Sequence, residues 1–356
     1  MELEKRLALI QEVGEEIITL EDLRQLLEKK KKPIAYDGFE PSGNVHIAQG
    51  LLRAINVNKM LKAGCHFKMW VADWHAMANK KLGGNLDDIQ TAGKYMIEVW
   101  KVAGLDTKKV EFLWASDFVK KPEYWKTVMQ IAMGSTVKRI VRCSQIMGRS
   151  ESEALSASQI FYPCMQAADI FHLEVDIAQL GLDQRKVNML AREIGPKLGF
   201  WKPVAVHHHM LMGLQLPNAV GIGAEKEIAM KMSKSIPDSA IFMTDSEKEV
   251  ERKISRAYCP EKQVQGNPVM EYCRFIVFEK NKKMRVERPS KFGGDVSFNS
   301  IGDLEAAFAS GDLHPMDLKN ATSSYLNEML EPVRKHFSKG KAKELLERVE
   351  DLKVTR

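Results

Sequence analysis

The fold is indicated by Ile34-Ala35-Tyr36 and by the decapeptide that soon follows, Pro41-Ser42-Gly43-Asn44-Val45-His46-Ile47-Ala48-Gln49-Gly50. The first three residues predict a short buried strand. The glycine-containing turn from Gly38 to Gly43 predicts entry into a helix near Val45 or His46. A helix that follows a strand in this way directs its free N–H groups and its positive dipole end beyond the strand. The stretch is therefore typical of a phosphate-binding turn, although taken alone it suits an ordinary turn equally well.

Four further strand candidates, at 68–73, 110–114, 173–178 and 204–206, alternate with helical patterns over the first two thirds of the chain. The helical patterns cover two segments within 2–31, the second opened by Thr19 with Asp22, and then 86–103 and about 122–172. Strands that alternate with helices predict a Rossmann-like parallel α/β sheet, which binds ligands beyond the carboxyl ends of its strands.

The chain has 356 residues, of which 44% are hydrophobic, enough for two domains. From about residue 246 the helical patterns carry many Lys and Arg and are interrupted by Lys291-Phe292-Gly293-Gly294-Asp295. We predict an α/β domain at 1–236 with a helical insertion at about 95–160, followed by a mostly helical domain at 237–356.

The composition indicates a cytoplasmic protein. A net charge of +6 permits a polyanionic partner without requiring one. The five cysteines are scattered, which predicts neither a disulfide framework nor a zinc site. The charged N-terminus is not that of a signal peptide, and no apolar run is long enough to cross a membrane.

A second motif, Lys231-Met232-Ser233-Lys234-Ser235, lies nearly two hundred residues after the first. Lys231 and Lys234 are flexible point charges, and Ser233 and Ser235 add hydroxyl donors. Such a loop can stabilise the charge that develops as pyrophosphate leaves. Lysine–serine loops are also common as solvated linkers. Both motifs in this order indicate an ATP site that activates a carboxylate by adenylation.

A third set of polar residues falls on one face of a predicted helix. Tyr162, Gln166 and Asp169 follow i, i+4, i+7 spacing. Apolar residues flank them on both sides, which favours a buried pocket over a solvent-facing stripe. Gln184, after the fourth predicted strand, is placed to join the same pocket.

The two motifs together resemble the two signatures of class I aminoacyl-tRNA synthetases. The second motif matches completely, whereas in the first Gln49 stands where a second histidine is common. The set Tyr36, Tyr162, Gln166, Asp169 and Gln184 resembles the amino-acid pocket of tyrosyl-tRNA synthetases of the archaeal and eukaryotic type. Short segments that resemble those of this family recur along most of the chain, among them Ala72-Asp73-Trp74-His75-Ala76 and Ala257-Tyr258-Cys259-Pro260.

The resemblance implies roles for the residues that match. Tyr36 and Asp169 would hydrogen-bond the phenol of tyrosine, and Tyr162, Gln166 and Gln184 would hold its α-ammonium group. ATP would be bound by Gly43, His46, Gln49, Gly181, Asp183, Lys231, Ser233 and Lys234. Catalysis would come from His46, Gln49, Lys231 and Lys234.

The resemblance also implies partners. Arg142 and Arg185 would read the first acceptor base pair of tRNA(Tyr), and Asp295 would read the anticodon. Arg142 could equally be an ordinary surface arginine, and Asp295 a turn residue. Mg²⁺ would arrive with ATP, without a dedicated protein metal site, and the insertion helices would form a homodimer.

Three alternatives remain at this stage. A tryptophanyl enzyme shares the architecture and both signatures, but Tyr36 with Asp169 argues against it, because an indole N–H needs only an acceptor. A non-catalytic RNA-binding relative would be expected to have lost signature residues. A different nucleotidyltransferase would leave residues 246–356 unexplained. We reject a zinc site at His207-His208-His209, since three consecutive side chains do not easily converge on one ion.

Overall fold

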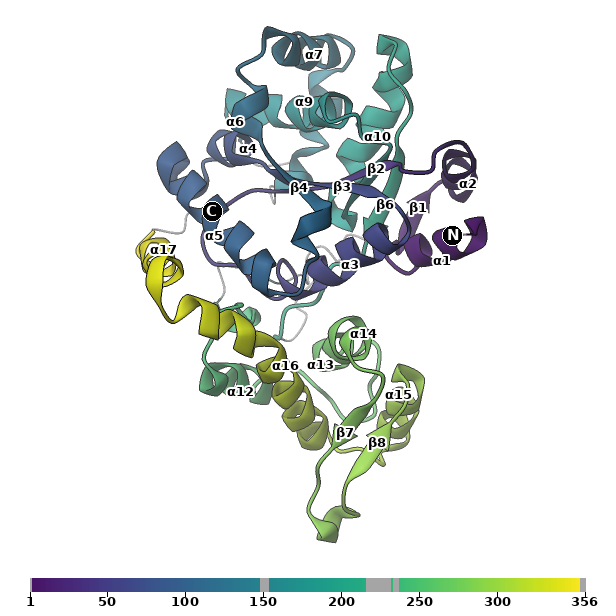
Figure 1. Cartoon of the computed structure of the whole chain (residues 1–356), viewed down its shortest axis with the longest axis vertical. Coiled ribbons are helices and arrows are strands. Elements are labelled where there is room, and N and C mark those ends of the chain that lie inside the picture. Colours follow the sequence, from purple (N-terminus) through teal and green to yellow (C-terminus); the bar gives the residue numbers. More distant parts are fainter. Residues whose placement is uncertain (1, 148–153, 216–231, 233–236, 353–356) are drawn as a thin grey trace.

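The computed structural model describes residues 2–147, 154–215, 232 and 237–352. A six-stranded sheet with helices on both faces forms the upper part of the molecule in Figure 1. Helices α12 to α16 and a two-stranded hairpin form the lower part, with the hairpin loop at the tip. The final helix, α17, returns to pack against α5 of the upper part.

The large sheet has the order β1-β6-β5-β2-β3-β4, and only β1 is antiparallel to its neighbour. Its strands are β1 Glu16–Ile18, β2 Ile34–Phe39, β3 His66–Val71, β4 Val110–Trp114, β5 Ile177–Gly181 and β6 Val204–His208. From β2 the chain builds outward to β3 and β4, then returns to β5 on the other side of β2. The strand order therefore reverses between β2 and β5, and the carboxyl ends of these two strands flank the expected ligand crevice.

Side chains alternate between the two faces of this sheet, and each face packs into its own apolar cluster. Ala35, Met69 and Ile177 belong to the cluster that also holds α3 and α5, whereas Tyr36 and Trp70 belong to the cluster around α7, α9 and α10. Every residue of β5 and β6 is buried. Burial on both faces therefore includes three polar side chains, those of Gln179, His207 and His208.

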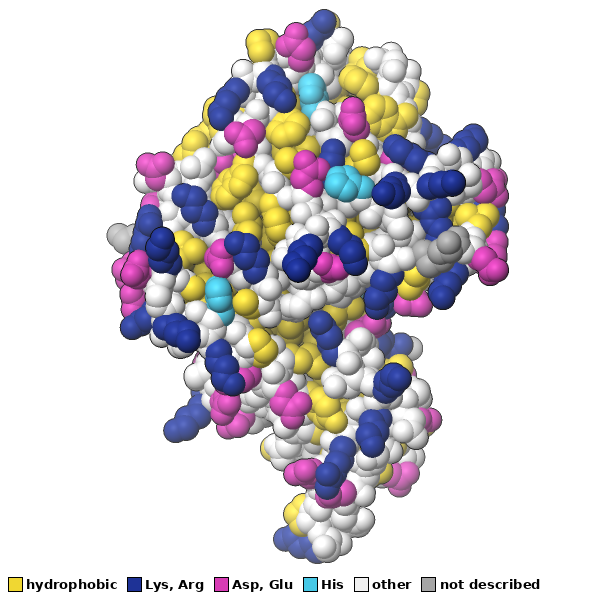
Figure 2. Space-filling view, in the orientation of Figure 1, with side chains coloured by type: hydrophobic (Ala, Val, Ile, Leu, Met, Phe, Trp, Pro, Cys, Tyr) yellow, Lys and Arg dark blue, Asp and Glu magenta, His cyan; other side chains and the backbone are white. Residues whose placement is uncertain are grey.

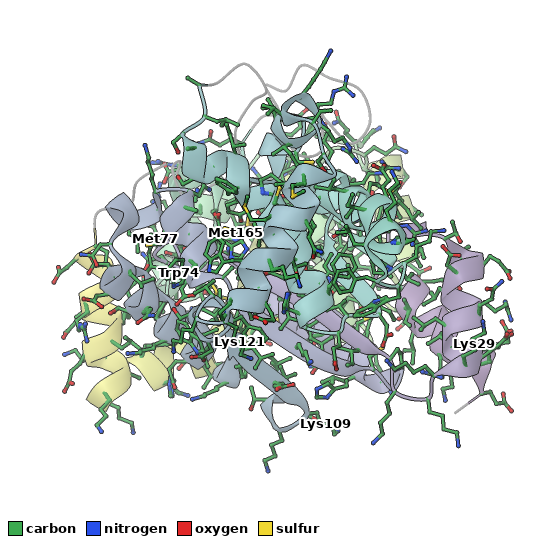
Figure 3. All side chains as sticks on the ribbon, turned by 90° about the horizontal axis from the view of Figure 1, so that it is seen from above. Lys29, Trp74, Met77, Lys109, Lys121 and Met165 are labelled. Carbon is green, nitrogen blue, oxygen red and sulfur yellow. The ribbon has the colours of Figure 1, made fainter. Side chains whose placement is uncertain are left out.

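The helices of the upper part are α1 Leu3–Gln11, α2 Leu20–Lys29, α3 Leu51–Lys62, α4 Asp73–Ala78, α5 Leu86–Val102, α6 Ala115–Phe118, α7 Pro122–Met133, α8 Val137–Val141, α9 Ala157–His172 and α10 Arg185–Ile194. Thr19 caps α2 by accepting a hydrogen bond from the Asp22 backbone N–H at 3.0 Å. Helix α4, with Trp74 and Met77, lies beside α9, with Met165 (Figure 3). The helices α6 to α9 occupy the connection between β4 and β5.

The lower part contains α12 Glu247–Ser255, α13 Pro268–Tyr272, α14 Phe278–Lys280, α15 Ile301–Ser310 and α16 Pro315–Phe337, and α17 spans Gly340–Glu350. Strands β7 Met284–Val286 and β8 Val296–Phe298 form the hairpin. No helix within the described ranges is long and apolar enough to cross a membrane.

The parallel α/β fold and its five predicted strands are confirmed, with three differences in detail. The strand expected at 173–178 begins only at Ile177. The short strand β1 and the hairpin β7–β8 were not predicted. The helix expected from Val45 or His46 begins at Leu51, because the backbone of residues 45–47 is engaged elsewhere.

Candidate active site

The first motif is held in an extended conformation against a distant segment. The Ile47 N–H donates to the Ile241 carbonyl at 2.9 Å, and the Met243 N–H donates to the Val45 carbonyl at 2.8 Å. His46 lies between them, opposite Phe242 in an isolated β-bridge. Residues 241–243 follow the second motif closely in sequence, so these bonds attach its C-terminal flank to the first motif.

Two glycines allow this arrangement. Gly43 has a φ of 100°, a conformation that side-chain-bearing residues rarely adopt. Gly50 faces Met243 so closely that an added Cβ would lie 2.3 Å from the methionine sulfur. The turn and the close approach both depend on the absence of a side chain.

Met232 is the one residue of the second motif that the structure describes. Its side chain is buried in the same apolar cluster as Val45, Ile47 and Ile241, and its N–H donates to the Leu211 carbonyl at 3.2 Å. Lys231, Ser233, Lys234 and Ser235 lie outside the described residues. Met232 and Ile241 thus both belong to the core that carries the first motif.

The carboxyl ends of β5 and β6 add a group of buried polar atoms. Asp183 is buried just beyond β5, and an added Cβ on Gly181 would lie 2.6 Å from its carboxylate. Gln179 and His208 are hydrogen-bonded at 2.6 Å. Gln179 Oε1 and His208 Nε2 are buried and have no hydrogen-bond partner within the described part of the chain, and the same holds for Gln49 Oε1 of the first motif. Buried polar atoms are normally satisfied, so this group is suited to receive a polar ligand.

An ion pair not predicted from the sequence joins β2 to α3. Arg53 Nε is 3.0 Å from Asp37 Oδ2, and both side chains are largely buried. Burial raises the pKa of the Asp37 carboxyl to about 7, against the opposing effect of the Arg53 charge. The guanidinium also lies over the Phe39 ring, 5.5 Å from its centroid.

The third predicted set surrounds the carboxylate of Asp169, which is 1% exposed. Trp70 Nε1 donates to Oδ2 at 3.1 Å, and the Tyr124 hydroxyl donates to Oδ1 at 2.8 Å. His75 Nε2 lies 2.9 Å from Oδ2. Burial works against the charged imidazole, but the Asp169 charge raises the pKa of His75. The Asp169 carboxylate therefore has three polar partners inside an apolar cluster.

Tyr36 is 1% exposed, and its hydroxyl has no hydrogen-bond partner within the described residues. Burial, and then the nearby Asp169 charge, raise the pKa of its phenol well above the usual value. A neutral hydroxyl next to a carboxylate can bind a hydroxyl-bearing ligand in either hydrogen-bonding direction.

The remaining residues of the set close the other side of the pocket. Gln166 Nε2 donates to Gln184 Oε1 at 3.1 Å, and Gln184 Nε2 donates to the Ile146 carbonyl at 3.2 Å. The Tyr162 ring meets the His75 ring edge-on, with centroids 5.1 Å apart. Gln166 Oε1 has no partner in the part of the chain described, which leaves an acceptor for a cationic ligand group.

These findings agree with the comparison to protein families, in which residues 28–331 match the model for class I tRNA synthetases of the tryptophan and tyrosine (W and Y) group. The chain belongs to this family. It is 52% identical to cytoplasmic tyrosine–tRNA ligase 1 of Arabidopsis thaliana, over 100% of this chain and 90% of the relative.

Solved synthetase structures show the same relationship. The tyrosyl-tRNA synthetase of Pyrococcus horikoshii, determined with L-tyrosine, has a TM-score of 0.92 and 42% identity, covering 98% of this chain and 100% of its own. The tryptophanyl-tRNA synthetase of Aeropyrum pernix has a TM-score of 0.67 at 18% identity, over 94% of this chain and 86% of its own, and shares the fold alone.

The residues that the resemblance assigns to tRNA are spread over the synthetase surface. Arg142 is exposed at the end of α8. Arg185 is the first residue of α10 and pairs with Glu16. Asp295 lies in the hairpin loop directly before β8, where it accepts from Arg285 Nη2 at 2.6 Å and from the Arg288 N–H at 3.0 Å. The face shown in Figure 2 carries many Lys and Arg side chains interspersed with acidic ones.

The three consecutive histidines of the synthetase have three separate sets of partners. His207 contacts Glu16 and Asn188, and His208 contacts Gln179. His209 lies 3.1 Å from both Glu15 and Glu271 and stacks on Phe275. Burial alone would lower the pKa of His209, but the two carboxylates raise it to about 10. His209 is therefore a charged link between the N-terminal segment and the lower part.

Proposed function

We propose that the pocket around Asp169 binds L-tyrosine and that the crevice between β2 and β5 binds ATP, so that the enzyme acts as a tyrosine–tRNA ligase. The observation that carries this proposal is the buried Tyr36 hydroxyl, which has no partner among the described residues and lies close to the Asp169 carboxylate. Phenylalanine has no hydroxyl to pair with the Tyr36 hydroxyl, which disfavours its binding.

The chemistry needs no protein nucleophile. A carboxylate oxygen of tyrosine attacks the α-phosphorus of ATP, the bond to the β-phosphate bridging oxygen breaks, and pyrophosphate leaves. A hydroxyl of the terminal ribose of tRNA then attacks the tyrosyl carbonyl carbon and AMP leaves. We assign stabilisation of the phosphorus transition state to His46, Gln49, Lys231 and Lys234, since positioning and electrostatics dominate such reactions.

ATP would bring Mg²⁺ with it, as phosphate-bound magnesium usually needs few protein ligands. Gly43, Gly181, Asp183 and Ser233 complete the proposed nucleotide site. This assignment is supported by the attachment of residues 241–243 to the first motif and by the burial of Met232.

We further propose a homodimer formed through the helices between β4 and β5. Large exposed apolar side chains support this choice, namely Met129 and Met133 of α7, Val137 of α8 and Phe161 of α9. Met133 is 84% exposed, an unfavourable position for a long apolar side chain in a monomer.

The remaining assignments concern organisation and location. We propose that residues 1–236 form the catalytic domain and residues 237–356 an anticodon-binding domain that uses Asp295. Arg142 and Arg185 are proposed to contact the acceptor end of tRNA(Tyr). A cytoplasmic location is proposed because the Arabidopsis relative is named as cytoplasmic.

The test is exchange of labelled pyrophosphate into ATP with each of the twenty amino acids, on the wild type and on Tyr36→Phe. We expect tyrosine alone to drive exchange in the wild type. Tyr36→Phe should reduce discrimination against phenylalanine by roughly ten- to a hundredfold, because it removes one polar group that phenylalanine leaves unpaired. Its stability should not fall, since the lost hydroxyl has no hydrogen-bond partner among the described residues.

Tyr258→Phe is the matched control, as this tyrosine is half-buried after α12, away from the pocket. Exchange driven by tryptophan and not by tyrosine would contradict the proposal and favour the tryptophanyl alternative. An unchanged tyrosine preference in Tyr36→Phe would remove Tyr36 from the phenol site.

A further inference from the structure

Arg185, at the start of α10, is paired with the carboxylate of Glu16 on β1. Its Nε lies 2.9 Å from both Glu16 oxygens, and the two side chains are 45% and 34% exposed. This contact uses only the Nε–H of the guanidinium, so its geometry does not require the two terminal amino groups. A guanidinium needs two parallel N–H groups for a bidentate contact with a guanine edge.

Glu16 is itself fixed by β6. The two residues Glu16 and His207 are register partners in the antiparallel pair of β1 and β6, and Glu16 Oε2 lies 2.8 Å from His207 Nδ1. An ionised carboxylate can only accept, so Nδ1 carries the proton. Burial lowers the pKa of His207, which favours the neutral ring, and Nε2 then accepts from Asn188 Nδ2 at 3.0 Å.

These contacts close a ring. Asn188 lies on α10, one turn after Arg185, so the hydrogen bonds run from the start of α10 to β1, on to β6 and back to α10. His207 and Asn188 are almost fully buried, and Arg185 is the most exposed member of the ring. An isolated surface ion pair must order two mobile side chains. In this ring the carboxylate is already ordered, which lowers the entropic cost of orienting Arg185.

We propose that Glu16 is a positioning residue that aims Arg185 at the first base pair of the tRNA acceptor stem. The inference rests on the proposed tRNA contact of Arg185. Besides orienting the guanidinium, the Glu16 charge offsets that of Arg185 and disfavours a sequence-independent phosphate contact, so the arginine is directed to a base edge. Glu16 therefore contributes to which tRNA is charged, through Arg185, without contacting the reacting atoms.

The test compares Glu16→Gln, Arg185→Ala and the wild type in charging two tRNA(Tyr) transcripts, one with its own first base pair and one with that pair inverted. Glu16→Gln keeps the size of the side chain but removes its charge. We expect it to reduce discrimination between the transcripts on the order of fivefold, mainly through KM for tRNA. The tyrosine-dependent exchange reaction should be affected far less. Glu16→Asp should restore part of the discrimination, because it keeps the charge.

Glu4→Gln is the matched control, since Glu4 forms a comparable exposed pair with Arg24 between α1 and α2. If Arg185→Ala leaves discrimination intact, the proposed tRNA contact of Arg185 is wrong. If Arg185→Ala loses discrimination but Glu16→Gln retains it, the positioning role of Glu16 is overturned while the tRNA contact stands. Equal losses in exchange and charging for Glu16→Gln would indicate a folding role and also overturn it.

Discussion

Asp169 in the proposed tyrosine pocket and Asp295 in the hairpin loop accept similar hydrogen bonds in opposite surroundings. Asp169 accepts from Trp70 and Tyr124 at 3.1 and 2.8 Å, and Asp295 accepts from Arg285 and the Arg288 backbone at 2.6 and 3.0 Å. The first carboxylate is 1% exposed, whereas the Asp295 side chain is 42% exposed. The shortest of these four contacts, between Arg285 and Asp295, is thus on the exposed carboxylate, where water can replace it.

This difference shows that contact distance does not rank the two sites by energy. A donor left unpaired inside the pocket loses both its partner and water, whereas a donor left unpaired on the loop recovers a water molecule. We therefore expect the effects of substitution to follow burial. His209, whose side chain is 15% exposed, gives an intermediate case.

The largest effect is expected from Asp169→Asn. The buried His75 imidazole, whose charged form Asp169 favours, loses its counter-charge, and removing one partner of a buried pair typically costs about 3–5 kcal/mol. The free energy of unfolding in urea should fall by about that amount, and tyrosine-dependent exchange by at least roughly a hundredfold. Asp117→Asn, at an exposed pair with Lys120, is the control and should change stability by less than about 0.5 kcal/mol. If Asp169→Asn changed the free energy of unfolding as little as the control does, the proposed dependence on burial would be wrong.

A smaller, pH-dependent effect is expected from His209→Gln. An unfolded histidine has a pKa of about 6.5, whereas the carboxylates of Glu15 and Glu271 raise that of His209 to about 10. The protonated ring therefore stabilises the fold fully below about pH 6.5, and this contribution disappears as pH rises through about 10. The wild type should exceed the variant in unfolding free energy by roughly 2–4 kcal/mol near pH 6, and the gap should narrow steadily towards pH 10. A gap that stays constant over this range would show that the stabilisation comes from stacking on Phe275 and not from charge.

The smallest effect on stability is expected from Asp295→Asn. The loop carboxylate pairs with an exposed Arg285, which holds its pKa below the usual range. Exposed pairs contribute little, so the melting temperature should be nearly unchanged at neutral pH. Charging of tRNA(Tyr) should fall while tyrosine-dependent exchange continues, if Asp295 reads the anticodon as proposed. Charging at the wild-type rate across several salt concentrations would exclude that role.

The sequence predicted the parts of the fold that depend on local patterns. The strands 110–114 and 204–206 and the helix 86–103 follow from apolar periodicity and are confirmed within a few residues. Strand β1 could not be predicted, because three residues give too short a period and their pairing partner is β6. The late start of α3 has the same cause, since residues 241–243 take up the backbone groups of 45–47.

In the candidate site, too, the sequence predicted what one local segment determines and missed what distant segments bring together. The spacing of Tyr162, Gln166 and Asp169 identified one wall of the pocket, since one helix carries all three. The sequence did not indicate the partners of Asp169, which are Trp70, His75 and Tyr124. His75 does stand in a segment that resembles the family. The three partners come from β3, α4 and α7, and no local pattern indicates that these elements converge on one carboxylate.

The pairing of β1 with β6 has a consequence for the order of synthesis. β1 is synthesised before every other strand of the described sheet, yet β6, its strand neighbour there, follows more than half a chain later. Until β6 emerges, Glu16 has no His207 to orient it and the β5 edge is open to unwanted association. A nascent or truncated chain that ends before Val204 should thus be a strong client for chaperones, whereas one that extends past His208 can close its own sheet.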